Sequence, residues 1–235
     1  DTDLGSGQRI PIGMGMAYDI PTWSFGVARS IMSMVRMKDA ATYEHCVRVS
    51  RMSRSLALAA GLNEFDQMIV EFAGLFHDIG KVGVPDSVLL KPDKLTNDEY
   101  ETMKSHPVLS VEILRPLSQV EFYELTIPGV RHHHERFDGR GYPHGVSGEE
   151  IPLASRIILV VDTFDAMTAT RPYRKGLPAE VAYKELADFA GRQFDPQLVK
   201  IFLDSHAMWK SQDRQQFDEV NNLVLPSIVI DNKAA

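Results

Sequence analysis

The sequence predicts an all-α fold, a multi-helix bundle interrupted by one Gly- and Pro-rich loop. From Thr22 onward, apolar residues recur at three- to four-residue spacing over most of the chain, which is typical of amphipathic helices. Alternating strand patterns are almost absent, and residues 223–230 are the one candidate strand. With 235 residues, of which 44% are hydrophobic and 24% charged, the chain is long enough to bury a full core as one domain.

The first third of the chain predicts three helices, over residues 22–37, 39–61 and 64–77. Thr22 is the expected N-cap of the first, and Gly61 is a typical stop for the second. Further on, Thr96 and Glu99 form a capping-box pattern that opens another helix. Pro107 then suits the first turn of the next one.

The second half predicts helical and loop segments in turn. A segment over residues 120–135 is expected to be interrupted at Pro128-Gly129. Residues 136–153 are dense in Gly and Pro and predict a loop, and residues 153–169 predict a strongly apolar helix. Pro178 and Asp195-Pro196 mark the starts of the last two helices.

Composition and domain organisation favour a cytoplasmic protein. Cys46 is the single cysteine, so no intramolecular disulfide can form, and a reducing compartment is the simplest reading. The longest aliphatic run, residues 157–161, is too short to span a bilayer, and no apolar leader opens the chain. The net charge of −7 argues against binding a nucleic-acid polymer by bulk attraction. We expect a linker or arm over 1–22, a catalytic domain over 23–205 and a tail over 206–235.

Histidines and aspartates form the most informative pattern. His77 and Asp78 are adjacent, and imidazole nitrogen can bind one metal ion while the carboxylate bridges to a second. Any one histidine alone is more often a surface or capped residue, but the whole set indicates a metal site. Its predicted ligands are His45, His77, Asp78, His106, His133, His134 and Asp162.

Asp162 has an alternative interpretation, and the polar residues outside the ligand set have other roles or none. Asp162 lies within an apolar helix, where a carboxylate is costly unless paired or metal-bound, so a structural ion pair is the alternative. Asp165 is one turn on and would orient a ligand histidine. We expect His132 to face outward. His144 and His206 are assigned no role.

Cations near this set indicate an anionic substrate. Lys81 follows His77 by about one turn, and Arg171 and Arg174 follow the helix that carries Asp162. Guanidinium groups bind phosphate in a bidentate fork, and lysine acts as a compact charge. On residue type alone, the alternative is that Lys81, Arg171 and Arg174 are ordinary solvated surface charges. Two metals with these cations predict hydrolysis of a phosphate ester.

The motifs together resemble the HD-GYP domain, the bacterial branch of the HD phosphohydrolase superfamily. Phe76-His77-Asp78-Ile79-Gly80-Lys81 and Gly141-Tyr142-Pro143 carry the resemblance, which covers residues 23–205. Matching segments occur in the expected order at 42–49, 76–85, 105–107, 133–143, 161–168 and 171–174.

The resemblance implies a bacterial, metal-dependent cyclic di-GMP phosphodiesterase. It implies that the seven predicted ligands hold two metal ions, that Asp78 bridges them, and that a metal-bridging hydroxide attacks phosphorus. Asp78 and Lys81 would then be catalytic. The substrate-binding residues would be Lys81, Arg171, Arg174 and Asp165.

One departure from the family concerns the metal count. Some members carry a glutamate one turn before the first ligand histidine, where it supports a third metal, and Ala41 stands there in this chain. We therefore expect two divalent ions. The resemblance favours iron, with manganese next, and the ligand types also suit Ni, Co or Zn. The sequence does not indicate which bases the substrate carries, so cyclic GMP-AMP stays open as a substrate.

The helix over 22–37 and the resemblance indicate regulatory partners, and two alternative functions stay open. An upstream sensor or receiver domain would signal through the helix over 22–37, whose apolar stripe would pair across a homodimer or pack on its own domain. A cyclic di-GMP synthase would contact the Gly141-Tyr142-Pro143 loop. The alternatives are a catalytically weak cyclic-dinucleotide-binding module, and an HD phosphohydrolase that acts on another nucleotide.

Overall fold

The computed structural model describes residues 20–170 and 175–212, and it confirms the all-α prediction. Within these residues, helices are joined by loops, and a single isolated bridge links Ala190 to Phe194. The helices are α1 Thr22–Lys38, α2 Ala40–Ala59, α3 Glu64–Phe76, α4 Asp86–Leu89, α5 Asn97–Met103, α6 His106–Leu114, α7 Glu121–Arg131, α8 Leu153–Thr168, α9 Ala179–Asp188 and α10 Pro196–Gln212. Short 3-10 helices cover Ile79–Gly83, Arg115–Leu117 and Gly148–Glu150.

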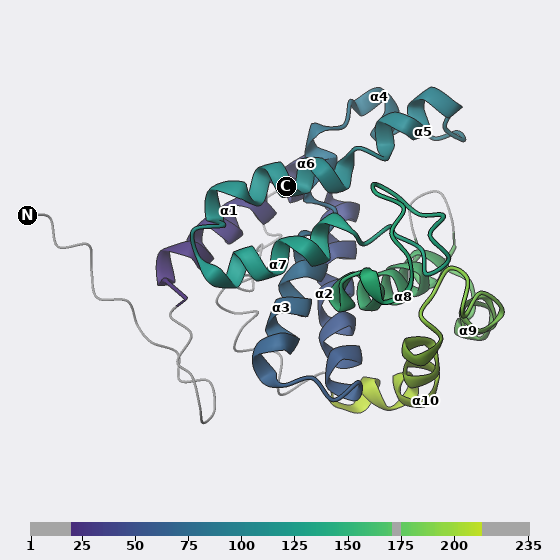
Figure 1. The fold of residues 1–235 in the computed structure, drawn as a ribbon. Helices are drawn as coiled ribbons and strands as arrows, with labels where there is room; N and C mark the ends of the chain where they lie inside the picture. Colours follow the sequence, from purple (N-terminus) through teal and green to yellow (C-terminus); the bar gives the residue numbers. More distant parts are fainter. Residues whose placement is uncertain (1–19, 171–174, 213–235) are drawn as a thin grey trace, which may run out of the picture.

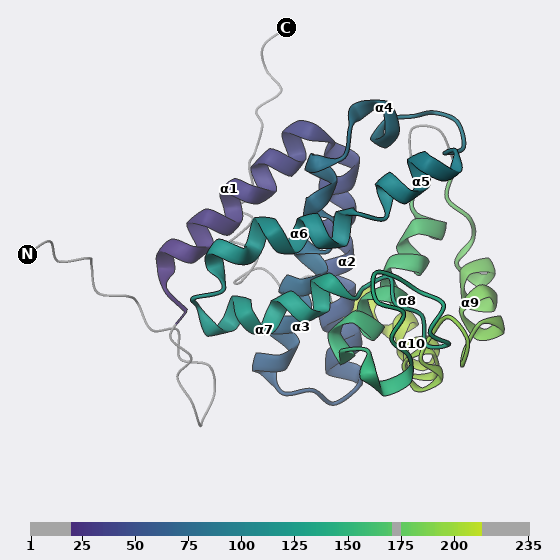
Figure 2. The same ribbon diagram turned by 45° about the horizontal axis from the view of Figure 1, so that its top comes forward.

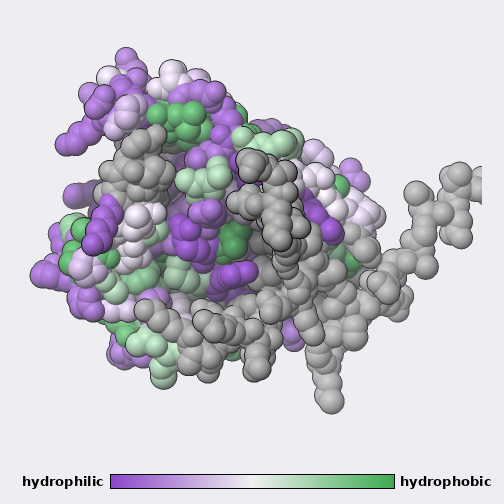
Figure 3. All heavy atoms as spheres, turned by 180° about the vertical axis from the view of Figure 1, so that it is seen from behind, coloured by the Kyte–Doolittle hydropathy of each residue, from purple (hydrophilic) through white to green (hydrophobic). Residues whose placement is uncertain are grey.

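The antiparallel pair α2 and α3 forms the centre of the bundle. α1 packs on α2, and α7 and α8 both pack on α3 (Figure 1). In both ribbon views α6 and α7 lie side by side, and α9 and α10 close the side of the molecule beyond α8 (Figure 2). Hydrophilic and hydrophobic residues are interspersed among the described residues of the rear face (Figure 3).

Side-chain caps explain where several helices begin. The Asp39 carboxylate accepts the backbone N–H groups of Ala41 and Thr42 at the start of α2. Thr96 and Glu99 form the predicted capping box at the start of α5. Thr22, the expected N-cap of α1, is instead the first helical residue and follows Pro21.

One predicted break does not occur. α7 continues through Pro128, which is exposed. The proline cannot donate the helical hydrogen bond to the carbonyl of Glu124. Because Glu124 is also exposed, water can reach that carbonyl. The neighbouring Gly129 is required by packing. A Cβ there would lie 2.8 Å from that of Ala73 and 2.9 Å from that of Ala154, so glycine lets α7 approach both α3 and α8.

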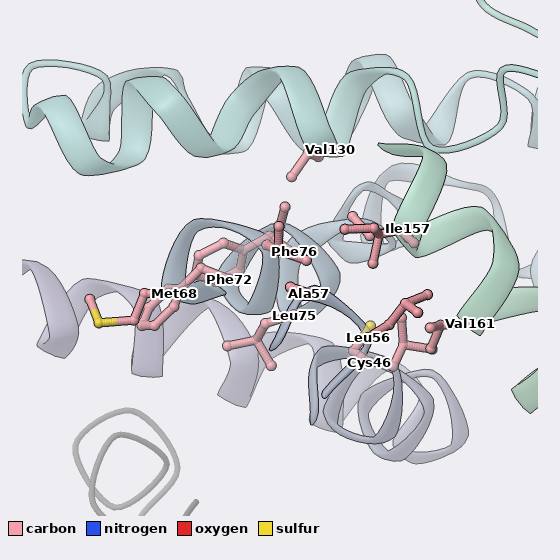
Figure 4. Close-up of a cluster of buried hydrophobic side chains, with 14 of the residues drawn as sticks. Cys46, Leu56, Ala57, Met68, Phe72, Leu75, Phe76, Val130, Ile157 and Val161 are labelled. Carbon is pink, nitrogen blue, oxygen red and sulfur yellow. The ribbon is translucent and has the colours of Figure 1, made fainter. Parts of the chain in front are cut away.

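The core lies between α2, α3, α7 and α8. Figure 4 shows Phe72, Phe76 and Leu56 among its side chains, all buried, with Ile157 and Val161 entering from α8. Cys46 is buried in the same cluster as a small apolar residue. The helices that carry the predicted ligands are therefore held against one another by a continuous apolar interior.

The last described helix extends past the expected end of the catalytic domain. The boundary expected at residue 205 falls inside α10, where Trp209 is buried against Phe202, so the packed body extends beyond it. The candidate strand over 223–230 lies outside the described residues. Among the described helices, none has both the length and the apolar character needed to cross a membrane.

Candidate metal centre

The seven predicted ligands come from five places in the fold and lie together. His45 projects from the middle of α2, His77 and Asp78 follow the end of α3, and His106 begins α6. The turn after α7 and the middle of α8 supply the others, His133, His134 and Asp162. The predicted set is thus brought into one cluster by three packed helices, α2, α6 and α8, and by the turns that follow α3 and α7.

The cluster divides into two adjacent groups, each able to hold a metal ion. One group consists of His45, His77 and Asp162, and the other of Asp78, His106, His133 and His134. Within each group the nitrogen and oxygen atoms lie within 4.8 Å of one another. Mixed imidazole and carboxylate donors of this kind suit divalent transition metals.

Asp78 connects the two groups. Its Oδ1 lies 3.1 Å from Nε2 of His106, and its Oδ2 lies 3.3 Å from Nε2 of His77 and 3.7 Å from Nε2 of His45. The two carboxylate oxygens thus reach imidazoles of both groups. Asp78 therefore lies between the two groups.

The same type of hydrogen bond orients three of the histidines. Nδ1 of His77 lies 2.7 Å from the carbonyl of Gly74, and His106 and His133 make the equivalent contact with the carbonyl three residues before them. A carbonyl only accepts, so each Nδ1 carries the proton and donates it. The lone pair of each Nε2 is therefore directed into the cluster, ready for a metal.

Unpartnered atoms in the cluster fit a cation. Nε2 of His106 and Nε2 of His133 lie 3.2 Å apart, although both carry lone pairs when Nδ1 is the donor. Among the described residues, Nε2 of His77 and Oδ1 of Asp78 are buried with no hydrogen-bond partner. Buried polar atoms without partners are costly, and metal ligation would satisfy them.

His45 is held from both sides by carboxylates. Its Nε2 lies 3.0 Å from Oδ1 of Asp162, and its Nδ1 lies 2.7 Å from Oδ2 of Asp165. Arg48 donates from Nε to Oδ1 of Asp165 at 2.7 Å and from Nη2 to Oδ2 at 2.9 Å. Arg48 was missed by the sequence analysis, and its position three residues after His45 on α2 was the available signal.

These contacts correct the role expected for Asp165. The residue is buried, and both of its oxygens are engaged by His45 and Arg48, which leaves neither oxygen free to contact a substrate. The orienting role that was also expected for it agrees with this placement. Asp162, by contrast, is partly exposed and directs Oδ1 at the ligand nitrogen of His45.

The electrostatics of the cluster differ from one histidine to the next. Burial disfavours the charged form of His45, but hydrogen bonds to Asp162 and Asp165 outweigh it and raise the pKa of His45 to about 9. The ring therefore gives up its Nε2 proton when that nitrogen binds a metal. Burial lowers the pKa of His134 to about 3, so this ring is neutral at pH 7.

Lys81 places a positive charge directly beside the bridging position. Its Nζ donates to Oδ2 of Asp78 at 2.5 Å. Burial opposes the charge of both groups, yet their attraction raises the pKa of Lys81 and, with a contribution from His77, holds that of Asp78 well below its usual range. Both side chains are therefore ionised at neutral pH.

Close backbone approaches lock the ligand turns together. Ser110 on α6 accepts the N–H of Gly80 at 2.8 Å and donates to the carbonyl of His77 at 2.9 Å. A Cβ on Gly80 would lie 2.1 Å from the carbonyl oxygen of His106, so only glycine fits there. The turn after α3 and the start of α6 thus form one unit.

The Gly141-Tyr142-Pro143 loop also reaches the centre. The Tyr142 ring stacks on His134 with centroids 4.8 Å apart, and Nζ of Lys104 lies 5.7 Å from the Tyr142 centroid. A Cβ on Gly141 would lie 2.3 Å from the backbone nitrogen of Arg136, which excludes other residues. The sequence analysis treated this loop as a structural element and a partner surface, and it assigned Tyr142 and Lys104 no contact with the ligands.

An open space adjoins the cluster on the α2 side. A cavity of about 280 Å³ is lined by His45, Arg48, Lys81, Ala41 and Glu44, among others. Arg171 and Arg174, the two predicted phosphate ligands, lie outside the described residues. Of the histidines given no role, His206 is buried with Nδ1 2.7 Å from the hydroxyl of Tyr183.

Comparison with known proteins identifies the class. A family model described as HD domain matches residues 29–198, and the chain belongs to that family. HD domain phosphohydrolases are metal-dependent, and the two groups of ligand atoms fit that chemistry.

Particular relatives carry the comparison further. A cyclic di-GMP phosphodiesterase of Thermotoga maritima is 36% identical over 83% of this chain and 53% of its own. The cyclic di-GMP phosphodiesterase response regulator RpfG of Xanthomonas campestris is 42% identical over 74% of this chain and 46% of its own. The chain thus spans about half the length of these relatives.

The fold also resembles a solved structure. A crystal structure of a cyclic GMP-AMP-specific phosphodiesterase of V. cholerae matches with a TM-score of 0.60 at 20% identity. It covers 86% of this chain and 53% of that one, and at this identity the likeness concerns the fold alone.

Proposed function

We propose that this domain hydrolyses the phosphodiester bonds of a cyclic dinucleotide, with cyclic di-GMP as the first candidate. The observation that carries the proposal is the pair of adjacent ligand groups joined by Asp78, with the ammonium of Lys81 beside the junction. The two curated relatives described above are both cyclic di-GMP phosphodiesterases, which supports this substrate.

The seven side chains would hold two divalent ions, with Asp78 shared between them. Ions in these positions would activate water as a nucleophile and neutralise charge on the phosphate. The chain's own contribution is positional. The carbonyl contacts of His77, His106 and His133 hold their Nε2 atoms inward, and Asp165 with Arg48 holds His45.

Lys81 would act on the substrate through its charge. Its raised pKa keeps the ammonium protonated, so it stabilises negative charge on phosphate oxygens and is a poor proton donor. Arg171 and Arg174, expected from the resemblance to grip the same phosphate, would complete the anion site. These groups read phosphate and not base edges, so cyclic GMP-AMP is the alternative substrate within the same class.

Metal identity follows from ligand type only in part. Five imidazoles and two carboxylates suit iron or manganese, and equally nickel, cobalt or zinc. We propose iron first and manganese second, as the resemblance to HD-GYP domains implies. Two ions per centre follow from Ala41, which has no ligating atom and lines the open cavity beside His45.

The deciding experiment combines metal analysis with a substrate panel. Protein purified without oxygen is analysed for metals and then assayed on cyclic di-GMP, cyclic GMP-AMP, linear dinucleotides and phosphomonoesters. Turnover of a cyclic dinucleotide with two bound ions supports the proposal. Binding without turnover in metal-replete protein would favour a signalling module, and activity confined to another nucleotide would favour a different HD phosphohydrolase.

The regulatory context is also proposed. α1 precedes the ligand helix α2 directly, so a sensor or receiver domain upstream would act through it, in a cytoplasmic setting. Its apolar stripe, which includes Phe25, Met32 and Val35, is buried against its own domain, so a homodimer would instead use the exposed residues Trp23, Val27, Met34 and Met37. The Gly141-Tyr142-Pro143 loop would be the contact for a cyclic di-GMP synthase. Light scattering with and without residues 1–37 tests the homodimer, and a monomer in both forms would contradict it.

A further inference from the structure

A third group of potential ligands lies outside the catalytic cluster. His132, expected to face outward, directs Nδ1 toward Oε1 of Glu135 at 3.7 Å, and Nδ1 of His144 lies 4.0 Å from the same oxygen. The three ligand atoms lie within 4.8 Å of one another, as in the two catalytic groups. The sequence analysis assigned none of these residues to a metal.

The carboxylate of Glu135 lacks an ordinary counter-charge. Its side chain is buried, and among the described residues no lysine or arginine forms an ion pair with it. Its partners are the backbone N–H groups of His144 and Gly145, which donate at 2.6 Å and 3.0–3.1 Å. A buried carboxylate is costly unless it is paired or coordinates a metal.

The two imidazoles supply the donors that such a carboxylate would need. Nδ1 of His132 is buried without a hydrogen-bond partner among the described residues. The ring of His144 lies 5.0 Å from that of His132, and its side chain is 48% exposed. One face of the group is therefore open to solvent, which would leave room for water to complete a coordination shell.

We propose that His132, Glu135 and His144 form an auxiliary site for a divalent transition metal, zinc by donor chemistry, separate from the catalytic pair. The observed separations of 3.7 and 4.0 Å need to shorten by a few tenths of an ångström for tetrahedral ligation, with ligand bonds of about 2.0–2.1 Å. The exposed His144 can make that adjustment. The backbone N–H groups on Glu135 provide the hydrogen bonds that commonly support a ligating carboxylate.

An ion here would brace the catalytic centre from outside. His132 immediately precedes the predicted ligands His133 and His134, and His144 immediately follows Pro143 of the loop whose Tyr142 stacks on His134. The ion would tie the ligand turn to the loop. The inference does not depend on the proposed reaction, because it concerns metal binding alone.

The test counts and locates metal ions with cobalt as the probe. Chelator-stripped protein is titrated with Co²⁺ and followed by elemental analysis, visible absorption and anomalous diffraction at the cobalt edge. The unaltered chain is expected to bind three equivalents, one of them between His132 and His144. His144→Ala is expected to lose that one and keep the catalytic two.

Two further variants keep the outcome decisive. His45→Ala should lose the cobalt ion of the group formed by His45, His77 and Asp162 and retain the auxiliary peak, whereas the double variant His45→Ala/His144→Ala should lose both of these ions. Added Zn²⁺ should raise the melting temperature of His45→Ala more than it raises the melting temperature of the double variant. An unchanged cobalt count in His144→Ala, or no anomalous peak beside Glu135, would overturn the proposal whether or not the protein hydrolyses cyclic dinucleotides.

Discussion

The carboxylate of Asp165 lies 2.7 Å behind Nδ1 of His45, on the side of the ring opposite to the ligand nitrogen. Arg48 holds that carboxylate with two hydrogen bonds, so Arg48 of α2 and Asp165 of α8 together support His45. Contacts of this kind fix the tautomer of a ligand histidine and strengthen its binding to a metal. The relationship motivates the first prediction.

Asp165→Asn should weaken metal binding by about 10–100-fold, because the amide cannot stabilise the donating Nδ1–H as a carboxylate does. The measurement is a competition titration of the stripped protein with a coloured chelator. Asp195→Asn is the matched control, since Asp195 is a buried carboxylate that pairs with Arg156 at 2.6 Å and contacts no predicted ligand. Equal metal affinity in both variants would contradict the supporting role.

Asp78→Ala should abolish hydrolysis and lower the bound metal, because it removes the carboxylate that reaches both groups. His77→Ala should do the same by removing a terminal ligand. Metal content by elemental analysis and turnover by chromatography are the two readouts. Asp86→Ala removes an exposed carboxylate paired with Lys38 and should change neither. Full activity and metal content in Asp78→Ala would refute bridging.

Lys81→Met should lower kcat/KM for the cyclic dinucleotide while most of the metal stays bound. A hydrogen bond to a charged group contributes about 1.5–3 kcal/mol, which corresponds to roughly ten- to 150-fold in kcat/KM. Lys91→Met is the control, because Lys91 has similar side-chain exposure (24% against 25%) and pairs with Glu99 instead. Steady-state kinetics decide, and equal kcat/KM in the two variants would exclude a substrate role for Lys81.

Gly80→Ala should destabilise the fold by about 1–3 kcal/mol, since the added Cβ meets backbone atoms of α6 at 2.1 and 2.4 Å. Gly26→Ala in α1 meets nothing within 4 Å and should stabilise by about 0.4–1 kcal/mol. Urea unfolding of the two variants measures both effects. Similar midpoints would show that the turn after α3 can move away from α6.

The catalytic centre should hold two ions, because Ala41 offers no ligand atom one turn before His45. Ala41→Glu places a carboxylate on the same face of α2, beside an open cavity of about 280 Å³, and should recruit a third ion there. Anomalous diffraction separates these positions from the group at His132. Three full peaks within the unaltered centre would show that another residue supplies the missing ligand.

Local sequence signals were sufficient for most of the helices, and they supplied the list of candidate ligands, which stays a prediction. The caps at Asp39 and Thr96 act on residues two to three positions away, so their effect can be predicted without knowing the fold. Pro128 shows the limit of local reasoning. Whether a proline breaks a helix depends on whether water reaches the freed carbonyl, and that depends on which face the bundle buries.

The sequence by itself determined which side chains can bind metal and which segments carry them as helices. Only the tertiary structure decided how those side chains group, because residues 45 and 162 meet through the packing of α2 on α8 and not through spacing along the chain. The same packing placed Asp165 behind His45. The loop that returns to the turn after α7 stacked Tyr142 on His134 and brought His144 beside His132 and the buried carboxylate of Glu135.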